Sequence, residues 1–191
     1  ELLKIAEKNK IKLFFEAAVA GGIPVLKVIR EGLSANKNFS LYGIMNGTCN
    51  YILTEMKNSK LSFNKALHQA QKLGYAESNP AEDISGADTV AKLSILTTLS
   101  FGCHSDIKNI NIEGIENIEP IDIIMAKELG YKISLLGMVS LKDNILIQRV
   151  HPCLVKETSI LSKVEGVLNA IVIKGDASKK VTMIGEGAGS G

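Results

Sequence analysis

The pattern of apolar residues changes at Tyr131, and this change limits the folds open to the chain. An extended run covers Lys132–Leu141, the turn sequence Lys142-Asp143-Asn144 follows, and a second extended run covers Ile145–Pro152. Two such runs around a short polar turn are typical of a β-hairpin. Further extended runs at 168–174 and 180–184 predict a C-terminal part that consists mainly of strands.

Before Tyr131, segments with helical periodicity alternate with shorter strand-like segments. We expect helices at residues 2–10, 25–32, 51–58, 62–74, 86–100 and 121–129, and strands at 12–18, 38–45 and 107–112. Strands therefore precede, interleave with and follow the helices, which predicts a mixed α+β fold.

The composition is that of a globular protein, with 46% hydrophobic and 22% charged residues and a net charge of +2. Basic residues are scattered among acids and Trp is absent, so we expect no nucleic-acid partner. The apolar stretches stop short of the roughly 20 residues that span a bilayer, so we expect no membrane partner. Three dispersed cysteines without a CxxC spacing argue against a zinc site or a disulfide framework, and they favour a reducing cytoplasm.

Charged groups concentrate in residues 74–92, which read GYAESNPAEDISGADTVAK. A turn at Asn79-Pro80 lets several of these acids point into a common space. Asp88 and Lys92 are four residues apart, so on a helix they share one face. Such a lysine can give a proton to a reacting oxygen, and the carboxylates can hold a substrate ammonium group. An ordinary solvated ion pair is the alternative, but the preceding loop and the apolar run that follows favour a site.

Three small-residue segments each allow two interpretations. The closing residues 185–191, GEGAGSG, resemble part of a phosphate loop, or they form a turn. The NGT sequence at 46–48 is suited to bind an anion at a helix N-terminus, or it simply caps that helix. The turn at 18–25, AVAGGIPV, can present carbonyl oxygens to a hard monovalent cation, although little else in the sequence requires this.

Taken together, these segments resemble homoserine dehydrogenase. EAAVAGGIPV, GIMNGTCNYIL, AQKLGYAESNPAEDISGADTVAK and GEGAG occur in the order of that family and at similar spacing. Asn79 and Ser78 depart from the residues common there, but neither is a catalytic group. The resemblance implies NADP- or NAD-dependent reduction of L-aspartate 4-semialdehyde to L-homoserine, in threonine and methionine biosynthesis. It also implies an α+β fold with a mixed or antiparallel sheet covered by helices.

The resemblance also assigns residues to roles around the substrate. Lys92 matches the catalytic lysine, which gives a proton to the aldehyde oxygen as hydride arrives. Glu77 and Asp88 match the substrate-binding acids, and Asp83 is expected to orient Lys92 or the substrate ammonium group. Thr48 lies in the strand-to-helix turn that lines the site.

Cofactor and cation positions follow from the same resemblance. Gly74 and Gly189 match positions where the backbone meets the nicotinamide cofactor. A sodium ion is expected at four positions, mainly through carbonyl oxygens: Glu16, Val19, Gly21 and Ile23.

The family also suggests how this chain is organised. We expect residues 1–191 to be a catalytic, substrate-binding and dimerisation domain, truncated at both ends, because no G-x-G-x-x-G nucleotide-binding fingerprint occurs near the start. Residues 185–191 would then begin the return to the missing nucleotide-binding domain. The strands at 131–141 and 145–152 resemble those that pair across the family's homodimer. We expect this chain alone to be inactive.

Two other functions remain open from the sequence alone. The acidic pocket could belong to an amino-acid-binding or dimerisation module without redox chemistry, in which Lys92 only neutralises the acids. It could also belong to another oxidoreductase that acts on a related aldehyde.

Overall fold

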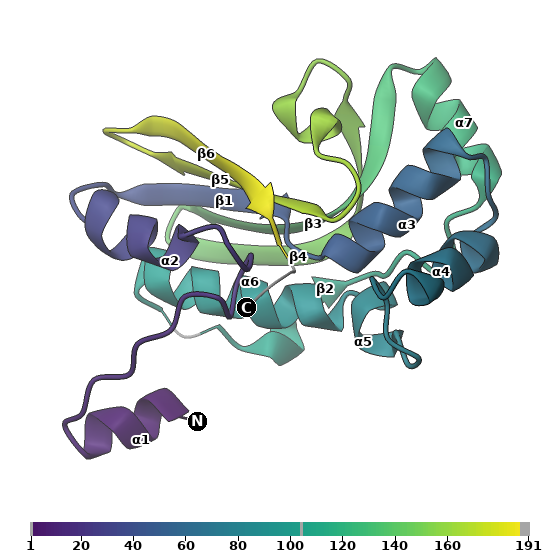
Figure 1. Ribbon diagram of the computed structural model, residues 1–191. Helices are drawn as coiled ribbons and strands as arrows, with labels where there is room; N and C mark the ends of the chain where they lie inside the picture. Colours follow the sequence, from purple (N-terminus) through teal and green to yellow (C-terminus); the bar gives the residue numbers. More distant parts are fainter. Residues whose placement is uncertain (1, 104, 188–191) are drawn as a thin grey trace.

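The computed structural model describes residues 2–103 and 105–187 (Figure 1). Within these residues one sheet has the strand order β2-β4-β3-β1-β5-β6. The strands are β1 Asn38–Ile44, β2 Asn111–Ile112, β3 Tyr131–Lys142, β4 Ile145–Lys156, β5 Leu168–Gly175 and β6 Lys179–Glu186. Only β2 and β4 pair in parallel, so this sheet is mixed, and the predicted α+β class is confirmed.

The predicted hairpin is the longest strand pair in the described sheet. Its strands β3 and β4 stay in register from Tyr131↔Lys156 to Lys142↔Ile145. The two turn residues, Asp143 and Asn144, have φ angles of 51° and 62°. Asp and Asn tolerate positive φ better than other non-glycine residues, which explains why this turn sequence closes a hairpin.

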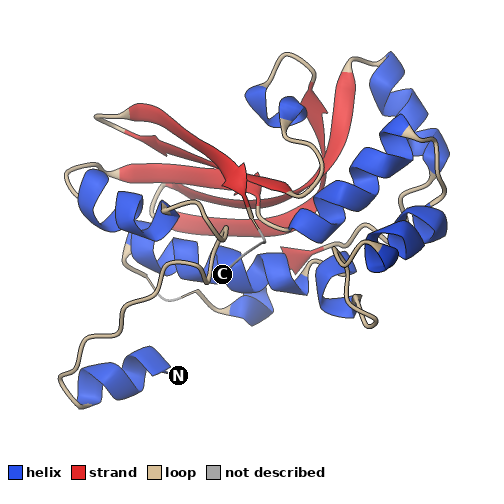
Figure 2. Ribbon diagram, in the orientation of Figure 1, coloured by secondary structure: helices blue, strands red, loops and turns tan. Residues whose placement is uncertain are grey.

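Helices lie on one side of the sheet, and the N-terminal helix α1 stands apart from it (Figures 1 and 2). They are α1 Leu2–Lys8, α2 Val25–Lys27, α3 Gly47–Asn58, α4 Phe63–Lys72, α5 Ala81–Ile84, α6 Ala87–Phe101 and α7 Pro120–Glu128, with a π-helical turn at Val28–Gly32. Helix α6 buries Val90, Leu93 and Leu96 against the sheet. A Cβ on Gly137 of β3 would lie 3.1 Å from Thr89 Cγ2, so glycine lets α6 approach the sheet closely.

The opposite face of the sheet is only partly covered within the described residues. Ile44, Leu136 and Val172 form a small second core with Leu161 and Val164, which come from the connection between β4 and β5. A short 3-10 helix, Ile160–Lys163, lies in this connection, on the side of the sheet away from α6 (Figure 1). The remainder of this face has no cover from the described chain.

Two predicted strands differ in the structure. Residues 12–18 form an irregular connection, and the strand prediction there is wrong: Phe14 is 80% exposed, and no neighbouring strand satisfies the backbone. The 107–112 segment forms a 3-10 turn at Ile107–Asn109, and only Asn111–Ile112 pairs, with β4. The acidic segment contains the short helix α5, which the sequence analysis did not predict.

None of the helices in residues 2–103 and 105–187 combines the length and the apolar character that crossing a membrane requires.

Candidate active site

The candidate site lies where β1 ends and the N-termini of α3 and α6 meet. Asn46 follows β1 and caps α3, because its Oδ1 accepts a hydrogen bond from Cys49 N at 2.8 Å. Gly86 precedes α6 with a φ of 86°, which glycine adopts without strain. The following turn carries Asp88 and, one turn later, Lys92. Local structure therefore places the predicted i, i+4 pair at the start of a helix beside the end of a strand.

A single amide joins the acids of this site. Asn46 Nδ2 donates to Asp83 Oδ1 at 2.7 Å and to Asp88 Oδ2 at 2.8 Å. Lys92 Nζ donates to the same Asp88 oxygen at 2.7 Å and to the Met45 carbonyl at 3.2 Å. The structure thus brings Asp83, Asp88 and Lys92 together as predicted. The Lys92 side chain is only 21% exposed, so water screens this ion pair less than a surface pair.

The cluster forms one wall of a cleft of about 360 Å³. The lining residues come from α3, the α4–α5 connection, α5, α6 and the ends of β5 and β6: Asn46, Gly47, Thr48, Leu73, Gly74, Tyr75, Asp83, Lys92, Val167 and Gly187. Lys92, Asp83, Thr48 and Gly74 therefore all face the cleft, as a binding site requires. Asp88 is absent from this lining and holds Lys92 through its carboxylate.

Thr48 ties two walls of the cleft together, since its Oγ1 donates to the Tyr75 carbonyl at 2.7 Å. Gly74 ends α4 with a φ of 78°, and its exposed backbone lies in the cleft. The other predicted cofactor position, Gly189, lies outside the described residues.

Glu77 sits apart from the charged cluster. Its side chain is exposed, and its backbone carbonyl accepts a hydrogen bond from Gln71 Nε2 at 3.1 Å. Within residues 2–103 and 105–187, its carboxylate makes no hydrogen bond or ion pair with Asp83, Asp88 or Lys92. The substrate-binding role of Glu77 therefore stays a prediction.

Cys49 is a buried neighbour of the cluster that the sequence analysis did not connect with it. Its Sγ donates to the Asp83 carbonyl at 3.1 Å. Burial raises the pKa of the Cys49 thiol well above its ordinary value, and the negative charges of Asp83 and Asp88 raise it further. A neutral buried thiol is a poor nucleophile, and the contact that Cys49 makes here is with the backbone of α5 at Asp83.

Asn46 is the functional residue that the sequence analysis missed. Helix capping was one of the two interpretations of NGT, and the structure confirms it, because Asn46 caps α3. What the sequence did not indicate is that the same side chain also joins two acids. The contacts with Asp83 and Asp88 bridge 37 and 42 residues, and no local pattern reveals them.

The predicted sodium positions lie in the connection that enters α2. Glu16 uses both carboxylate oxygens there, accepting from Leu26 N at 2.7 Å and from Lys27 N at 2.9 Å. The Ile23 carbonyl accepts from Val25 N at 2.7 Å. Both Glu16 carboxylate oxygens are thus occupied by backbone N–H groups at the start of α2, and the sodium position stays a prediction.

Chemically, the cleft joins a lysine cation with carboxylates at a partly water-excluded wall. The lysine can donate a proton to an oxygen that gains negative charge. Asp83 keeps Oδ2 free of protein hydrogen bonds within the described residues, so it can accept from an ammonium group. This combination suits a substrate with an amino group and a reducible carbonyl.

The comparisons with known proteins agree on one family. The sequence profile described as Homoserine dehydrogenase matches residues 24–191. The homoserine dehydrogenase of Helicobacter pylori is 50% identical over 175 residues, which are 92% of this chain and 42% of that protein. The enzyme of Neisseria gonorrhoeae is 43% identical over 190 residues, covering 100% of this chain and 44% of that protein.

Solved structures give the same result. A homoserine dehydrogenase from Thiobacillus denitrificans superposes with a TM-score of 0.96 at 43% identity, over 99% of this chain and 44% of that one. A hyperthermophilic archaeal homoserine dehydrogenase mutant, solved in complex with NADPH, gives a TM-score of 0.81 at 28% identity, over 98% and 54%. The chain spans about half the length of the curated relatives that it matches, from 42% to 55%.

Proposed function

This chain belongs to the homoserine dehydrogenase family, and from that premise we propose its function in the full-length protein. It supplies the catalytic groups for reduction of L-aspartate 4-semialdehyde to L-homoserine, a step of threonine and methionine biosynthesis. The observation that carries the proposal is Lys92, held by Asp88 and the Met45 carbonyl at the wall of a cleft that Asp83 also lines.

In this reaction Lys92 is the proton donor. A bound reduced nicotinamide supplies the hydride. Lys92 Nζ stabilises the negative charge that develops on the former carbonyl oxygen and gives that oxygen a proton. Asp88 fixes the direction of the ammonium group, because it accepts one of its hydrogens at 2.7 Å. Asp83, which lines the cleft, accepts a hydrogen bond from the substrate ammonium group. Glu77 and Asp88 are the further acids that the family resemblance assigns to this group.

The nicotinamide end of NADP or NAD would lie against the glycine-lined part of the cleft. Gly74 and Gly187 line it there, and Gly189 follows two residues later in the sequence. Glycines allow a ligand to approach the backbone closely, and Thr48 offers a hydroxyl nearby. The solved archaeal relative in complex with NADPH supports this class of cofactor.

The test of this function is an assay of the full-length protein with L-aspartate 4-semialdehyde and both NADPH and NADH. We expect turnover with at least one cofactor, and negligible turnover by the 191-residue chain alone. A full-length protein that binds homoserine without oxidising or reducing anything would instead support the amino-acid-binding module, which the family match does not favour.

We further propose that the protein is a homodimer that covers the open sheet face. Tyr42 and Met138 are half-buried there, and the exposed Ile147 and Ile184 share this face because their pairing partners point to it. Such a patch is rarely left open to water. Sedimentation of the full-length protein should give a dimer, and Ile147→Lys should shift it toward the monomer.

A sodium ion at Glu16, Val19, Gly21 and Ile23 is a further part of the proposal, with the carbonyl-rich turn as its support. Replacing Na⁺ with a large organic cation should lower the melting temperature of the full-length protein. If the melting temperature and the activity do not change, the proposed sodium site is wrong. We also propose a cytoplasmic location, with the free thiols of Cys49, Cys103 and Cys153 as its support.

A further inference from the structure

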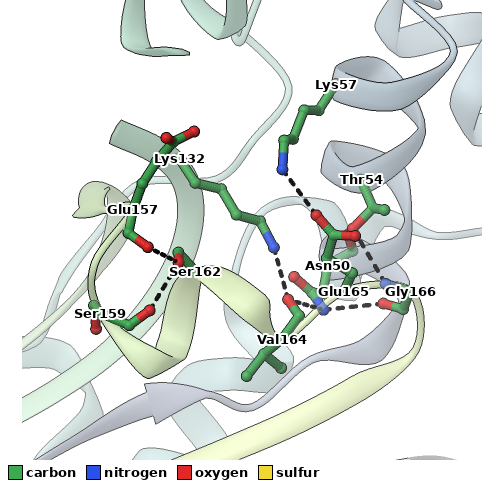
Figure 3. A network of polar contacts seen from close by, with 10 residues as sticks. All are labelled: Asn50, Thr54, Lys57, Lys132, Glu157, Ser159, Ser162, Val164, Glu165 and Gly166. Atoms are coloured by element: carbon green, nitrogen blue, oxygen red, sulfur yellow. Dashed lines mark hydrogen bonds and ion pairs between the residues drawn. The ribbon is translucent and has the colours of Figure 1, made fainter. Parts of the chain in front are cut away.

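One wall of the cleft is held by a helix that also forms another wall. Residues 164–168 connect the 3-10 helix Ile160–Lys163 to β5, and this segment contributes Val167 to the cleft. Three polar side chains of α3 face the segment at helical spacing, Asn50, Thr54 and Lys57 (Figure 3).

Asn50 makes most of the contacts with this segment. Its Nδ2 lies 3.2 Å from the Val164 carbonyl, 3.0 Å from the Gly166 carbonyl and 3.1 Å from the Leu168 carbonyl. The two amide hydrogens are therefore shared among three acceptors. Asn50 is 2% exposed, so water cannot replace these bonds in the folded state.

Three other side chains, those of Thr54, Lys57 and Lys132, make further contacts around that amide. Gly166 N donates to Thr54 Oγ1 at 3.2 Å, and the same hydroxyl donates to the Asn50 carbonyl at 2.7 Å. Lys57 Nζ pairs with Glu165 Oε1 at 2.9 Å. From β3, Lys132 Nζ donates to the Val164 carbonyl at 2.6 Å. The backbone of the segment is thus bonded from two elements (Figure 3).

The same helix reaches the cleft directly at its N-terminus. Gly47 and Thr48 line the cleft, and a Cβ on Gly47 would lie 3.0 Å from the Val167 carbonyl oxygen. The first turn of α3 and the backbone of Val167 are therefore in close contact, with no space between them for a side chain at position 47. A shift of residues 164–168 moves Val167 relative to Thr48 and to Lys92 across the cleft.

We propose that Asn50 is a positioning residue that fixes Val167 and thereby the width of the substrate cleft. This inference rests on the proposed function, because the cleft is the proposed site of the semialdehyde and the nicotinamide. Asn50 touches no reacting atom in this account. Its amide acts through the backbone of residues 164–168.

A first experiment tests the positioning without any substrate. Hydrogen–deuterium exchange of the full-length protein is compared for wild type and Asn50→Ala, with Lys60→Ala, at an exposed site just beyond the C-terminal end of α3, as a control. We expect exchange at Gly166 to accelerate at least about tenfold in Asn50→Ala, with amides of α6 unchanged. Equal protection of residues 164–168 in wild type and variant would overturn the proposal.

A second experiment asks whether Asn50 acts through Val167. Kinetics are measured for Asn50→Ala, Val167→Ala and the double variant. We expect Asn50→Ala to raise KM for the semialdehyde by about tenfold with a smaller change in kcat, and Val167→Ala to add less than about threefold in the Asn50→Ala background. Effects on kcat/KM that multiply would overturn the proposal.

Two further results keep the outcomes distinct. If Asn50→Ala does not fold, Thr54→Val replaces it. This variant removes the acceptor of Gly166 N and the hydroxyl that donates to the Asn50 carbonyl, but it keeps the Asn50 amide. The same faster exchange and coupling with Val167 are then expected, at about threefold. If the wild type exchanges as expected but turns over no semialdehyde, the proposed function fails. If the wild type is active but residues 164–168 exchange equally in wild type and Asn50→Ala, only the positioning role of Asn50 is wrong.

Discussion

Two lysines, Lys92 on α6 and Lys132 on β3, show how surroundings decide what a cation can do. Lys92 lines the cleft, bonds directly to the Asp88 carboxylate and keeps 21% of its side chain exposed. Lys132 is 4% exposed and, among the described residues, bonds only to the Val164 carbonyl. The first is a paired cation open to a ligand, and the second is an inward-facing cation bonded to a neutral carbonyl.

Burial disfavours the charged form of Lys132. Burial lowers the pKa of Lys132 from 10.5 to about 8, with Lys57 adding to the shift and Glu165 opposing it. The comparison teaches that a carboxylate partner and an opening to the cleft distinguish a candidate catalytic lysine from a structural one. Substitutions at four residues test this difference, taken from the largest expected effect to the smallest.

The largest effect is expected at Lys92 itself. Lys92→Ala in the full-length protein should lower kcat by roughly 10²–10⁴ and leave substrate binding largely intact, because proton donation is lost in the transition state. Lys65→Ala, at an exposed site on α4, is the matched control. A Lys92→Ala variant with near-normal kcat would remove this lysine from the mechanism and erase the contrast with Lys132.

The next effect is expected at Asn46, which joins Asp83 and Asp88. Asn46→Ser keeps an acceptor for Cys49 N but loses the amide between the carboxylates, whereas Asn46→Ala loses both. We expect kcat/KM to fall about 10–100-fold in both variants, because two acids without a shared donor repel. Only Asn46→Ala should also lose about 1 kcal/mol of stability. Normal activity in Asn46→Ser would reduce Asn46 to a helix cap.

A pH-dependent effect on stability is expected at Lys132. Because its pKa is lower in the folded state, the unfolded chain binds more protons here between pH 8 and 10.5. The free energy of unfolding should therefore rise with pH across this window, by at most about 3 kcal/mol from this residue, and be lowest below pH 8. Lys132→Met should lack that rise.

Urea unfolding at pH 7, 8.5 and 10 measures this effect, with Lys142→Met at the exposed end of the same strand as the control. Lys132→Met should be no less stable than wild type at pH 7, since Asn50 still donates to the Val164 carbonyl. If the free energy of unfolding of Lys132→Met rises with pH as steeply as that of wild type, the buried lysine is not the cause of the rise.

The smallest effect is expected at the partly exposed pair of Lys57 and Glu165. Burial is incomplete on both sides, so Lys57→Met should change the free energy of unfolding by less than about 1 kcal/mol. It should change kcat/KM by less than about twofold, since Asn50 still holds residues 164–168. If Lys57→Met lowers kcat/KM as much as Asn50→Ala does, the ion pair of Lys57 and Glu165 positions residues 164–168 instead of Asn50.

The sequence predicted the parts of the site that depend on local spacing. Asp88 and Lys92 lie on one helix face, as the i, i+4 spacing requires, and their ion pair forms. Helix ends at Gly74 and Gly86 follow from glycine conformation. The strand predicted at 12–18 failed because a strand also needs a neighbour, which local pattern does not supply.

The tertiary structure decided which distant groups meet. Asn50 and the carbonyl of Leu168 are 118 residues apart, and Lys132 and Val164 are 32 apart, yet they share one network. The sequence separation of neither pair predicts a contact.

The sequence by itself determined the α+β class, the hairpin after Tyr131 and the residue types gathered around Lys92, because periodicity, turn chemistry and helical spacing are local properties. Only the tertiary structure decided that Asp83 faces the cleft, that Asp88 holds the lysine, and that Lys132 is buried. Those outcomes depend on how the sheet brings strand ends and helix N-termini together. Burial, which controls both charge and hydrogen bonding, exists only once the elements have packed.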